Sequence, residues 1–360
     1  MDRSDPASRP RRGGSRGPAR VGTANLRDVA AHAGVSPATA SRVFAGNENV
    51  QDATRARVLA SAEALGYVFN GLARAMTGRG QRTIAFVVRA MIGPTFAAMA
   101  AGAERVASAH NHLLLMSTTQ GDPDREAELI GTLREQRVSA VLLVGSTETD
   151  TAFEERVTGY AKSLADIDAP LILCGRPPVP GVSGLVSVDY DQATGMHDAV
   201  DELVRAGHTR IAYIGAARGM TTAELRMDGF TDALAEHGLH VYPELIRIAD
   251  NDEADGARAA AALLGLDTPP TAIVAMTDNI AVGVYRAARE RGLTIPDALS
   301  VVGFDDVPMV ADLSPGLTTV HPPFSEVGVR AAEIALGLTP AENVCFAPRF
   351  VRRGSVGAPA

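Results

Sequence analysis

The chain has 360 residues, of which 46% are hydrophobic and 21% are charged, enough apolar material for two or three folded domains. Its two cysteines, Cys174 and Cys345, form no Cys-x-x-Cys motif, which argues against a zinc finger, a redox motif or a disulfide framework. The net charge of −8 is unevenly divided: residues 1–82 carry 13 arginines and 6 acidic residues, whereas residues 83–360 carry 21 basic and 36 acidic residues. A basic N-terminal part is typical of a protein that binds a polyanion.

The N-terminal segment, residues 1–24, is rich in Arg, Gly, Pro and Ser and poor in apolar side chains. Such a segment buries too little surface to offset its chain entropy, so we expect a disordered basic tail that either adds weak contacts to phosphates or is dispensable. It lacks the apolar stretch of a secretory signal. No apolar run elsewhere approaches the roughly 18–20 residues that cross a bilayer. We therefore expect a cytoplasmic protein that does not bind a membrane.

Residues 25–69 are predicted to form a small domain of three short helices, because apolar residues recur there at helical spacing. The helices are expected over residues 26–33, 37–45 and about 52–65, the last with Val58, Leu59, Ala62 and Leu65 on one face. Asn25 is a candidate cap of the first helix. Ser36, followed by Pro37, is a candidate cap of the second. Gly34 marks a tight turn between them, and two helices joined in this way are typical of a helix-turn-helix unit.

The second of these helices has two faces of different character. Ala40, Val43 and Phe44 are expected to point inward, and Pro37, Ala38, Ser41 and Arg42 outward. The Arg42 guanidinium can donate to guanine O6 and N7 in the major groove. Thr39 and Ser41 can donate to phosphates. The same pattern also fits the solvated face of a small helical bundle.

Residues 70–82 follow as a connecting segment. Residues 70–77 are too few for a stable isolated helix, and residues 77–82 have the composition of a linker.

The remaining residues, 83–360, alternate short apolar segments with longer amphipathic ones. Candidate strands begin at Ile84, Leu113, Val141 and Leu171, and again at Ile211, Ile246, Ile273 and Val301. Their spacing of about 30 residues fits strand–helix–strand units. Continuous apolar strands indicate parallel sheets that are buried on both faces. The predicted fold class is α/β: two doubly wound subdomains with a ligand cleft between them, at the carboxyl ends of the strands.

The sequence Leu-Arg-Asp-Val-Ala-Ala-His-Ala-Gly-Val-Ser-Pro-Ala-Thr-Ala-Ser-Arg-Val-Phe-Ala-Gly, residues 26–46, closely resembles the DNA-binding domain of the LacI/GalR (lactose-repressor) family. The match continues through Leu65-Gly66-Tyr67 and reaches Asn-Gly-Leu-Ala-Arg-Ala-Met, residues 70–76, which resembles the family's hinge. The resemblance implies an N-terminal helix-turn-helix domain, a hinge and a periplasmic-binding-protein-like core. It also implies a homodimer that binds an inverted-repeat operator in double-stranded DNA.

This resemblance assigns roles to the residues of the N-terminal domain. Pro37, Ala38 and Arg42 would contact bases, and Thr39, Ser41 and Tyr67 would contact phosphates. The hinge, which begins at Asn70, would fold to a short helix only on DNA. Met76 would then enter the minor groove at the central base step and kink the duplex.

The resemblance extends over the core, through Arg226-Met227-Asp228-Gly229-Phe230, Thr277-Asp278-Asn279 and Gly303-Phe304-Asp305-Asp306. It implies an effector cleft lined by Arg226, Thr277 and Asp305, with Phe96 and Phe324 as apolar walls. Charged groups that bind hydroxyl pairs, together with aromatic faces, suit a sugar. Alternatively, Arg226 forms a structural ion pair, and Phe324 belongs to the core.

The chain contains no Gly-x-Ser-x-Gly, no His-Glu-x-x-His and no dinucleotide fingerprint. We therefore expect no catalytic residues, no cofactor and no metal site. The predicted function is a sequence-specific transcriptional regulator, most often a repressor in this family, controlled by a sugar effector. The absence of a leucine-heptad tail favours a dimer over a tetramer. The alternatives are a cytoplasmic sugar-binding protein without a regulatory role and an α/β enzyme that acts on a sugar.

Overall fold

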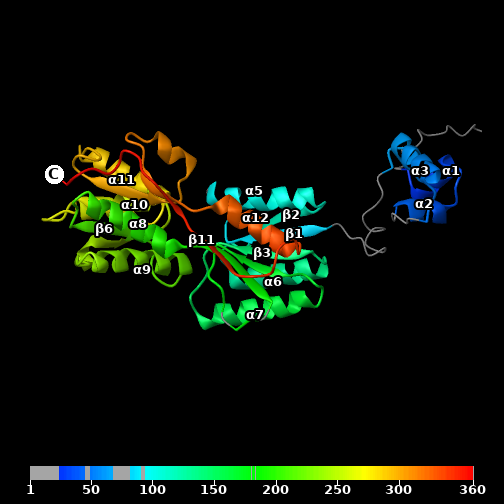
Figure 1. Cartoon of the computed structure of the whole chain (residues 1–360), viewed down its shortest axis with the longest axis horizontal. Helices are drawn as coiled ribbons and strands as arrows, with labels where there is room; N and C mark the ends of the chain where they lie inside the picture. The colour runs from blue at the N-terminus through cyan, green and yellow to red at the C-terminus, as the bar shows by residue number, and fades with distance from the viewer. Residues whose placement is uncertain are drawn as a thin grey trace, which may run out of the picture. The chain divides into compact units, whose positions relative to one another are not determined.

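The computed structural model describes residues 24–44, 49–67, 82–90, 94–179, 181–182 and 184–359. The chain divides into two compact units, residues 1–81 and residues 82–360 (Figure 1). The predictions for the N-terminal tail, for Asn70 and for Met76 fall outside the described residues, apart from the tail's last residue.

The N-terminal unit contains three helices: α1 (Leu26–His32), α2 (Pro37–Phe44) and α3 (Asp52–Ala64). Asn25 caps α1 as predicted: its side chain accepts from the amides of Arg27 and Asp28, and the Asp28 carboxylate accepts from the Asn25 amide. This reciprocal arrangement is a capping box. Gly34 has φ +64°, the left-handed conformation that favours glycine, and so lets the chain turn from α1 into α2. Ser36 Oγ then accepts from the Thr39 amide at 3.1 Å, which confirms the predicted second cap.

The core of this unit is a cluster of small apolar side chains, in which Val29, Ala40 and Val58 are almost completely buried. The inward positions predicted for Ala40 and Val43 are confirmed, and Phe44 packs against the cluster with its ring 5.6 Å from that of Tyr67. The prediction for Leu59 is wrong, because its side chain is 49% exposed. Helices α1 and α2 cover one narrow stripe of α3, and the residue after Val58 is rotated about 100° away from that stripe.

The second unit consists of two α/β subdomains. The first has the strand order β11-β5-β4-β3-β1-β2, with every pair parallel. Its elements are β1 (Thr83–Val88), α5 (Pro94–Ala109), β2 (Leu113–Thr118), α6 (Pro123–Glu135), β3 (Ala140–Val144), α7 (Thr151–Ala165), β4 (Leu171–Cys174), β5 (Leu185–Tyr190), α12 (Phe324–Ala335) and β11 (Val344–Phe346).

The second subdomain has the order β12-β10-β9-β8-β6-β7, and β12 is its antiparallel strand. Its elements are α8 (Gln192–Arg205), β6 (Ile211–Gly215), α9 (Thr221–Glu236), η1 (Pro243–Leu245), β7 (Ile246–Ile248), α10 (Glu253–Leu263), β8 (Ala272–Ala275), α11 (Asp278–Glu290), β9 (Ser300–Phe304), η2 (Pro308–Asp312), β10 (Thr318–His321) and β12 (Arg349–Val351).

The chain crosses between the two subdomains three times: from β5 to α8, from β10 to α12, and from β11 to β12. Helix α12 thereby returns to the first subdomain, where it lies beside α5 (Figure 1). The two helices approach closely because Gly102 and Gly328 face the backbone of the partner helix, which leaves no room for a Cβ atom. The three crossings fix the carboxyl ends of both sheets near one another, which creates the cleft.

All eight predicted core strands are present, and both sheets are essentially parallel, so the predicted fold class is confirmed. The expectation that every strand is buried on both faces is wrong for the edge strand β2. Leu113, Leu115 and Met116 are 55%, 39% and 37% exposed, whereas Leu114 packs against the core. An edge strand has a neighbour on one side alone, and α5 covers the face to which Leu114 belongs.

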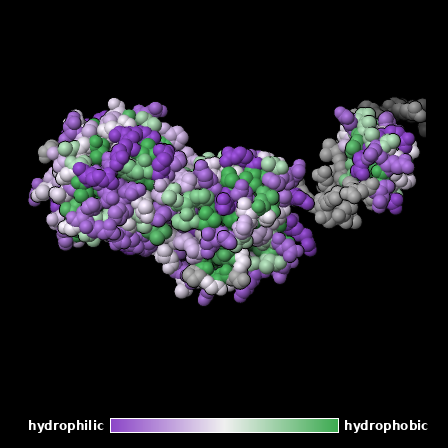
Figure 2. All heavy atoms as spheres, in the orientation of Figure 1, coloured by the Kyte–Doolittle hydropathy of each residue, from purple (hydrophilic) through white to green (hydrophobic). Residues whose placement is uncertain are grey.

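Hydrophilic residues cover much of the visible surface of both core subdomains, with the larger apolar areas on the first one (Figure 2). None of the helices among the described residues combines the length and the apolarity needed to cross a membrane.

Candidate functional site

The outward face of α2 is as predicted. Pro37, Ala38 and Arg42 are exposed, and Ser41 is half-buried. Arg42 lines a shallow groove together with Thr39, Thr54 and residues 49–51 at the start of α3. A helix of this kind, with a free guanidinium-bearing face, has the shape that enters the major groove of DNA.

Two of the residues predicted to contact phosphates already have partners within the domain. The Thr39 hydroxyl lies 2.9 Å from Ser36 Oγ, so it is part of the cap of α2. Tyr67 is half-buried against Phe44, and burial raises the pKa of its hydroxyl, which therefore stays protonated and can donate. Both side chains remain partly accessible.

A cavity of about 290 Å³ lies between the two core subdomains. Its lining comes from the carboxyl ends of strands in both sheets, where ligands bind in open α/β folds. The five residues predicted for the effector site all line it: Phe96, Arg226, Thr277, Asp305 and Phe324. The structure thus brings together side chains that are up to 228 positions apart in the sequence.

Arg226, on α9, is held by four partners although its side chain is only 2% exposed. Its Nε donates to Gln192 Oε1 at 3.1 Å, and its Nη1 donates to the Met276 carbonyl at 2.5 Å. Nη2 donates to both the Tyr190 hydroxyl, at 3.2 Å, and Asp305 Oδ1, at 3.1 Å. Arg226 therefore forms a structural ion pair with Asp305 and also lines the cavity.

Asp305 follows β9 directly and has φ +113°, an unusual conformation for a residue with a side chain. Such outliers cluster at functional sites, because the surrounding structure must maintain them. Burial raises the pKa of the Asp305 carboxyl, and the Arg226 guanidinium opposes that shift. Oδ1 accepts from Arg226, which leaves Oδ2 as a further acceptor of a residue that lines the cavity.

Thr277 caps α11, because its Oγ1 accepts from the Ile280 amide at 3.4 Å. The same hydroxyl donates to Asn251 Oδ1 at 2.5 Å. Its hydrogen-bonding capacity is therefore largely used, and the Asn251 amide, which also lines the cavity, is the better placed of the two to contact a ligand.

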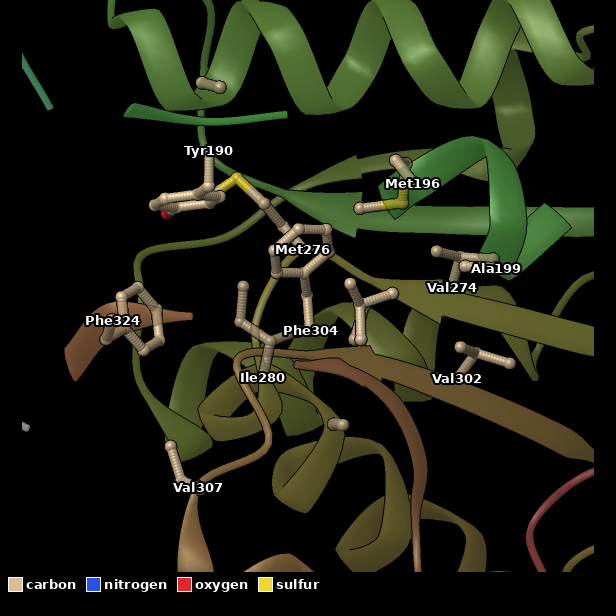
Figure 3. Packing of buried hydrophobic residues seen from close by; sticks show 14 of the residues in the cluster. Tyr190, Met196, Ala199, Val274, Met276, Ile280, Val302, Phe304, Val307 and Phe324 are labelled. Carbon is tan, nitrogen blue, oxygen red and sulfur yellow. The ribbon is translucent and has the colours of Figure 1, made fainter. Parts of the chain in front are cut away.

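Aromatic and thioether side chains form the apolar wall. The Phe324 ring packs edge-on against Tyr190 with centroids 5.4 Å apart, and Phe96 is half-buried beside Gly145. Figure 3 shows Tyr190, Met276 and Phe324 close to Phe304, on which the Arg226 guanidinium stacks at 3.7 Å from the ring centroid.

The sequence analysis missed Tyr190, Asn251 and Met276 as lining residues. Each lies at the carboxyl end of a strand: Tyr190 is the last residue of β5, Met276 directly follows β8, and Asn251 lies three residues after β7. The rule that ligands bind at the carboxyl ends of parallel strands could have identified the last two, whose strands were predicted. Strand β5 itself was not predicted.

Backbone hydrogen bonds join the subdomains beside the cavity. The amide of Thr221 donates to the Thr147 carbonyl at 2.8 Å, and the amide of Thr149 donates to the Gly219 carbonyl at 3.2 Å. The Thr222 amide donates to Ser146 Oγ at 3.1 Å. These contacts hold the two subdomains in one arrangement beside the cavity. Among the residues that the structure describes, no cluster of His, Cys, Asp or Glu could hold a metal ion.

Comparison with known proteins decides which family these features belong to. Residues 25–70 match the family described as "Bacterial regulatory proteins, lacI family", and residues 200–356 match "Periplasmic binding protein-like domain". The transcriptional regulator GalR of Escherichia coli is 31% identical over 93% of this chain and 96% of its own length. The chain belongs to the LacI family.

Further relatives agree with this assignment. Catabolite control protein A of Priestia megaterium is 31% identical over 85% of this chain and 90% of its own length. A Lac repressor dimer bound to operator has the same fold, with a TM-score of 0.81 at 23% identity over 93% of this chain and 99% of that one. This LacI-family protein is therefore a DNA-binding transcriptional regulator and not an enzyme, which confirms the predicted class of function and removes the sugar-binding protein and the enzyme as alternatives.

Proposed function

We propose that this LacI-family regulator is a cytoplasmic repressor that binds an inverted-repeat operator as a homodimer and responds to a small sugar in its core cleft. The observation that carries the effector assignment is the cavity of about 290 Å³, which is lined both by a charged pair, Arg226 and Asp305, and by aromatic side chains. Carboxylate and guanidinium groups bind sugar hydroxyls, and aromatic faces cover the C–H patches of a sugar ring.

The size of the cavity favours a small effector. Small-molecule sites are typically about 300–1,000 Å³, and this one lies at the lower end. One similar solved structure is a complex of the transcriptional regulator CelR with cellobiose. It is 27% identical over 92% of this chain and 99% of its own chain, with a TM-score of 0.66. The cellobiose in that complex supports a sugar as the class of effector here.

The operator is read, in this proposal, by Pro37, Ala38 and Arg42, with phosphate contacts from Thr39, Ser41 and Tyr67. The domain boundaries are those expected from the sequence: a basic tail over 1–24, the DNA-binding domain over 25–69, a hinge over 70–82 that contains Asn70 and Met76, and the core over 83–360. The effector is bound by Phe96, Arg226, Thr277, Asp305 and Phe324, to which we add Tyr190 and Asn251.

Two core elements supply a face for the dimer. The edge strand β2 exposes Leu113, Leu115 and Met116, and the edge strand β7 exposes Ile248, which is 59% accessible. Exposed apolar side chains on an unpaired sheet edge favour association and are otherwise a liability. We propose that a second copy of the chain covers them.

The effector acts through the closure angle of the core. A sugar that prefers one angle changes the separation of the two hinges in the dimer and so the free energy of folding them on DNA. Such coupling is typically about 1–3 kcal/mol, or a factor of about 5–150 in affinity.

Selection of operator sequences from random duplex DNA, followed by titration of the selected site with mono- and disaccharides, tests the proposal. We expect a palindromic consensus and a shift in its affinity with one class of sugar. No preference over random duplex at physiological salt would contradict the regulatory function.

A further inference from the structure

A second, smaller cavity adjoins the cleft within the first core subdomain. It has a volume of about 20 Å³, enough for one water-sized oxygen atom. Its walls come from segments that follow β1, β2, β3 and β4, so it lies at the carboxyl end of that sheet. Arg89 and Ser146 line both this cavity and the effector cleft, so the two spaces adjoin.

The most buried charged side chain in the wall of the small cavity is that of Arg176, which is 4% exposed. Its Nη2 donates to the Val144 carbonyl at 3.1 Å, whereas its Nε and Nη1 are buried without a hydrogen-bond partner. Burial lowers the pKa of Arg176 to about 10, so the group is still a cation at neutral pH. A buried donor without a partner costs about 1–3 kcal/mol and more when it is charged, so native proteins retain few of them.

The neighbouring carboxylates do not supply the missing acceptor. Glu148 is already engaged by two other cations, because it lies 3.3 Å from the Arg156 guanidinium and 3.6 Å from that of Arg89. Glu126 Oε1 is buried without a partner, and desolvation raises the pKa of this carboxyl, which disfavours its charged form. Among the described residues around this cavity, guanidinium nitrogens of both Arg156 and Arg176 are therefore buried without a partner. The wall of the cavity has more hydrogen-bond donors than acceptors.

The mouth of the cavity is formed by Arg89, whose side chain is 49% exposed. Its guanidinium lies over Gly121, which has φ +75° and no Cβ to displace it. About half of the Arg89 side-chain surface is exposed to solvent, so the side chain is free to change its rotamer. It is therefore suited to close over a group that enters from the effector cleft.

We propose that this cavity is an oxyanion subsite of the effector cleft, so that the effector is a sugar that carries a phosphate or a carboxylate. The ring lies in the cleft, and one oxygen of the anionic group accepts from Arg176, while Arg89 binds the group from the cleft side. This inference rests on the proposed role of the cleft as the effector site. It narrows the effector from any sugar to an acidic one, because a buried cation forms a stronger hydrogen bond with a charged acceptor than with a neutral hydroxyl.

Calorimetric titration of the full chain with inorganic phosphate and, separately, with acetate at constant ionic strength tests the subsite directly. We expect saturable binding of one of these anions, which also tells a phosphate from a carboxylate. Arg176→Gln is expected to weaken that binding at least tenfold, and Arg89→Gln several-fold. Arg134→Gln is the matched control, because Arg134 lies at the far end of α6, paired with Asp166 at 3.3 Å on the surface.

No saturable binding of either anion, or equal binding by the wild type and both Arg176→Gln and Arg89→Gln, would overturn the subsite and leave a cavity that holds water. If circular dichroism shows that Arg176→Gln does not fold, the exposed Arg89→Gln decides the question alone. The failure of the proposed function looks different. Anion binding that Arg176→Gln abolishes, combined with operator affinity that no sugar changes, would support the subsite and remove the regulation by sugars.

Discussion

The Asp305 carboxylate is held by Arg226 at 3.1 Å, and the two side chains differ in accessibility, 13% for Asp305 and 2% for Arg226. The arginine is the fixed partner, because its guanidinium is bound on three nitrogens and stacked on Phe304. The carboxylate is the partner that meets the cavity. The two residues therefore have different roles, and substitutions should separate them.

Asp305→Asn should leave the fold and operator binding intact and weaken the effector response. The amide oxygen can still accept from Arg226. The ligand, however, loses a hydrogen bond to a charged acceptor, which is worth about 1.5–3 kcal/mol. We expect the half-maximal effector concentration in an operator-binding titration to rise by a factor of about 10–150. Arg226→Ala, in contrast, should lower the free energy of unfolding in urea by about 3–5 kcal/mol, because it leaves a buried carboxylate without its cation. A normal response of Asp305→Asn would remove this residue from the effector site.

Arg42→Ala should reduce operator affinity by about 1–3 kcal/mol and relax the preference at one base position, because a bidentate contact to guanine is lost. Binding to a library of single-base operator variants measures both effects. Arg134→Ala makes the same change of charge on the surface of the effector-binding unit and should have no such effect. Unchanged selectivity of Arg42→Ala would reject the placement of α2 in the major groove.

Met76→Ala tests the proposed hinge wedge. A smaller side chain cannot hold the central base step open, so the operator should bend less and bind more weakly. Gel phasing measures the bend, and binding to the same operator at constant salt measures the affinity. A bend that stays the same in the variant would show that Met76 does not enter the minor groove.

Leu113→Glu combined with Leu115→Glu should convert the dimer to a monomer at micromolar concentration. Charged groups on the apolar edge of β2 would be buried without partners if a second copy covered it. Sedimentation velocity gives the oligomeric state. Leu338→Glu is the control, since Leu338 is also 46% exposed but lies after α12, away from this edge. A double variant that remains dimeric would place the interface elsewhere.

Asp189→Asn should alter the pH dependence of stability. Burial raises the pKa of Asp189 to about 6. The negative charge of Asp191 raises this pKa further, and the positive charge of Arg226 lowers it. Between about pH 4 and pH 6, Asp189 is therefore protonated in the folded state and ionised in the unfolded state. The contribution of Asp189 to the free energy of unfolding falls as the pH rises through this window. Asn cannot ionise, so the variant should lose this slope and gain at most about 3 kcal/mol at pH 7. Urea unfolding at pH 4.5 and pH 7 measures the difference, and parallel curves for both proteins would contradict the shift.

Local sequence signals predicted the N-terminal domain in detail. Asn25 and Ser36 act as caps and Gly34 as the turn because each of these effects depends on residues within four positions. The apolar strands of the core were equally visible, since burial on both faces leaves a continuous apolar run. The strands β11 and β12, at the sheet margins, have three residues each, which is too short for an apolar run to stand out from its surroundings.

Long-range pairing is what the sequence left open. Nothing near Thr277 announces that its hydroxyl will be engaged by Asn251, 26 positions away, or that Leu113 will lie on an uncovered edge. The unpartnered nitrogens of Arg176 are likewise a property of four strand ends that meet in space.

By itself the sequence determined the three N-terminal helices, two of their caps, eight core strands in their order along the chain, and the family. These follow from the polarity and backbone preferences of neighbouring residues, which act over a few positions. Only the tertiary structure decided which oxygen of Asp305 is free, which strand edges are open, and that a buried cation lies beside the effector cleft. Those features depend on the three crossings of the chain, which bring the carboxyl ends of two sheets together, and on the water that their packing excludes.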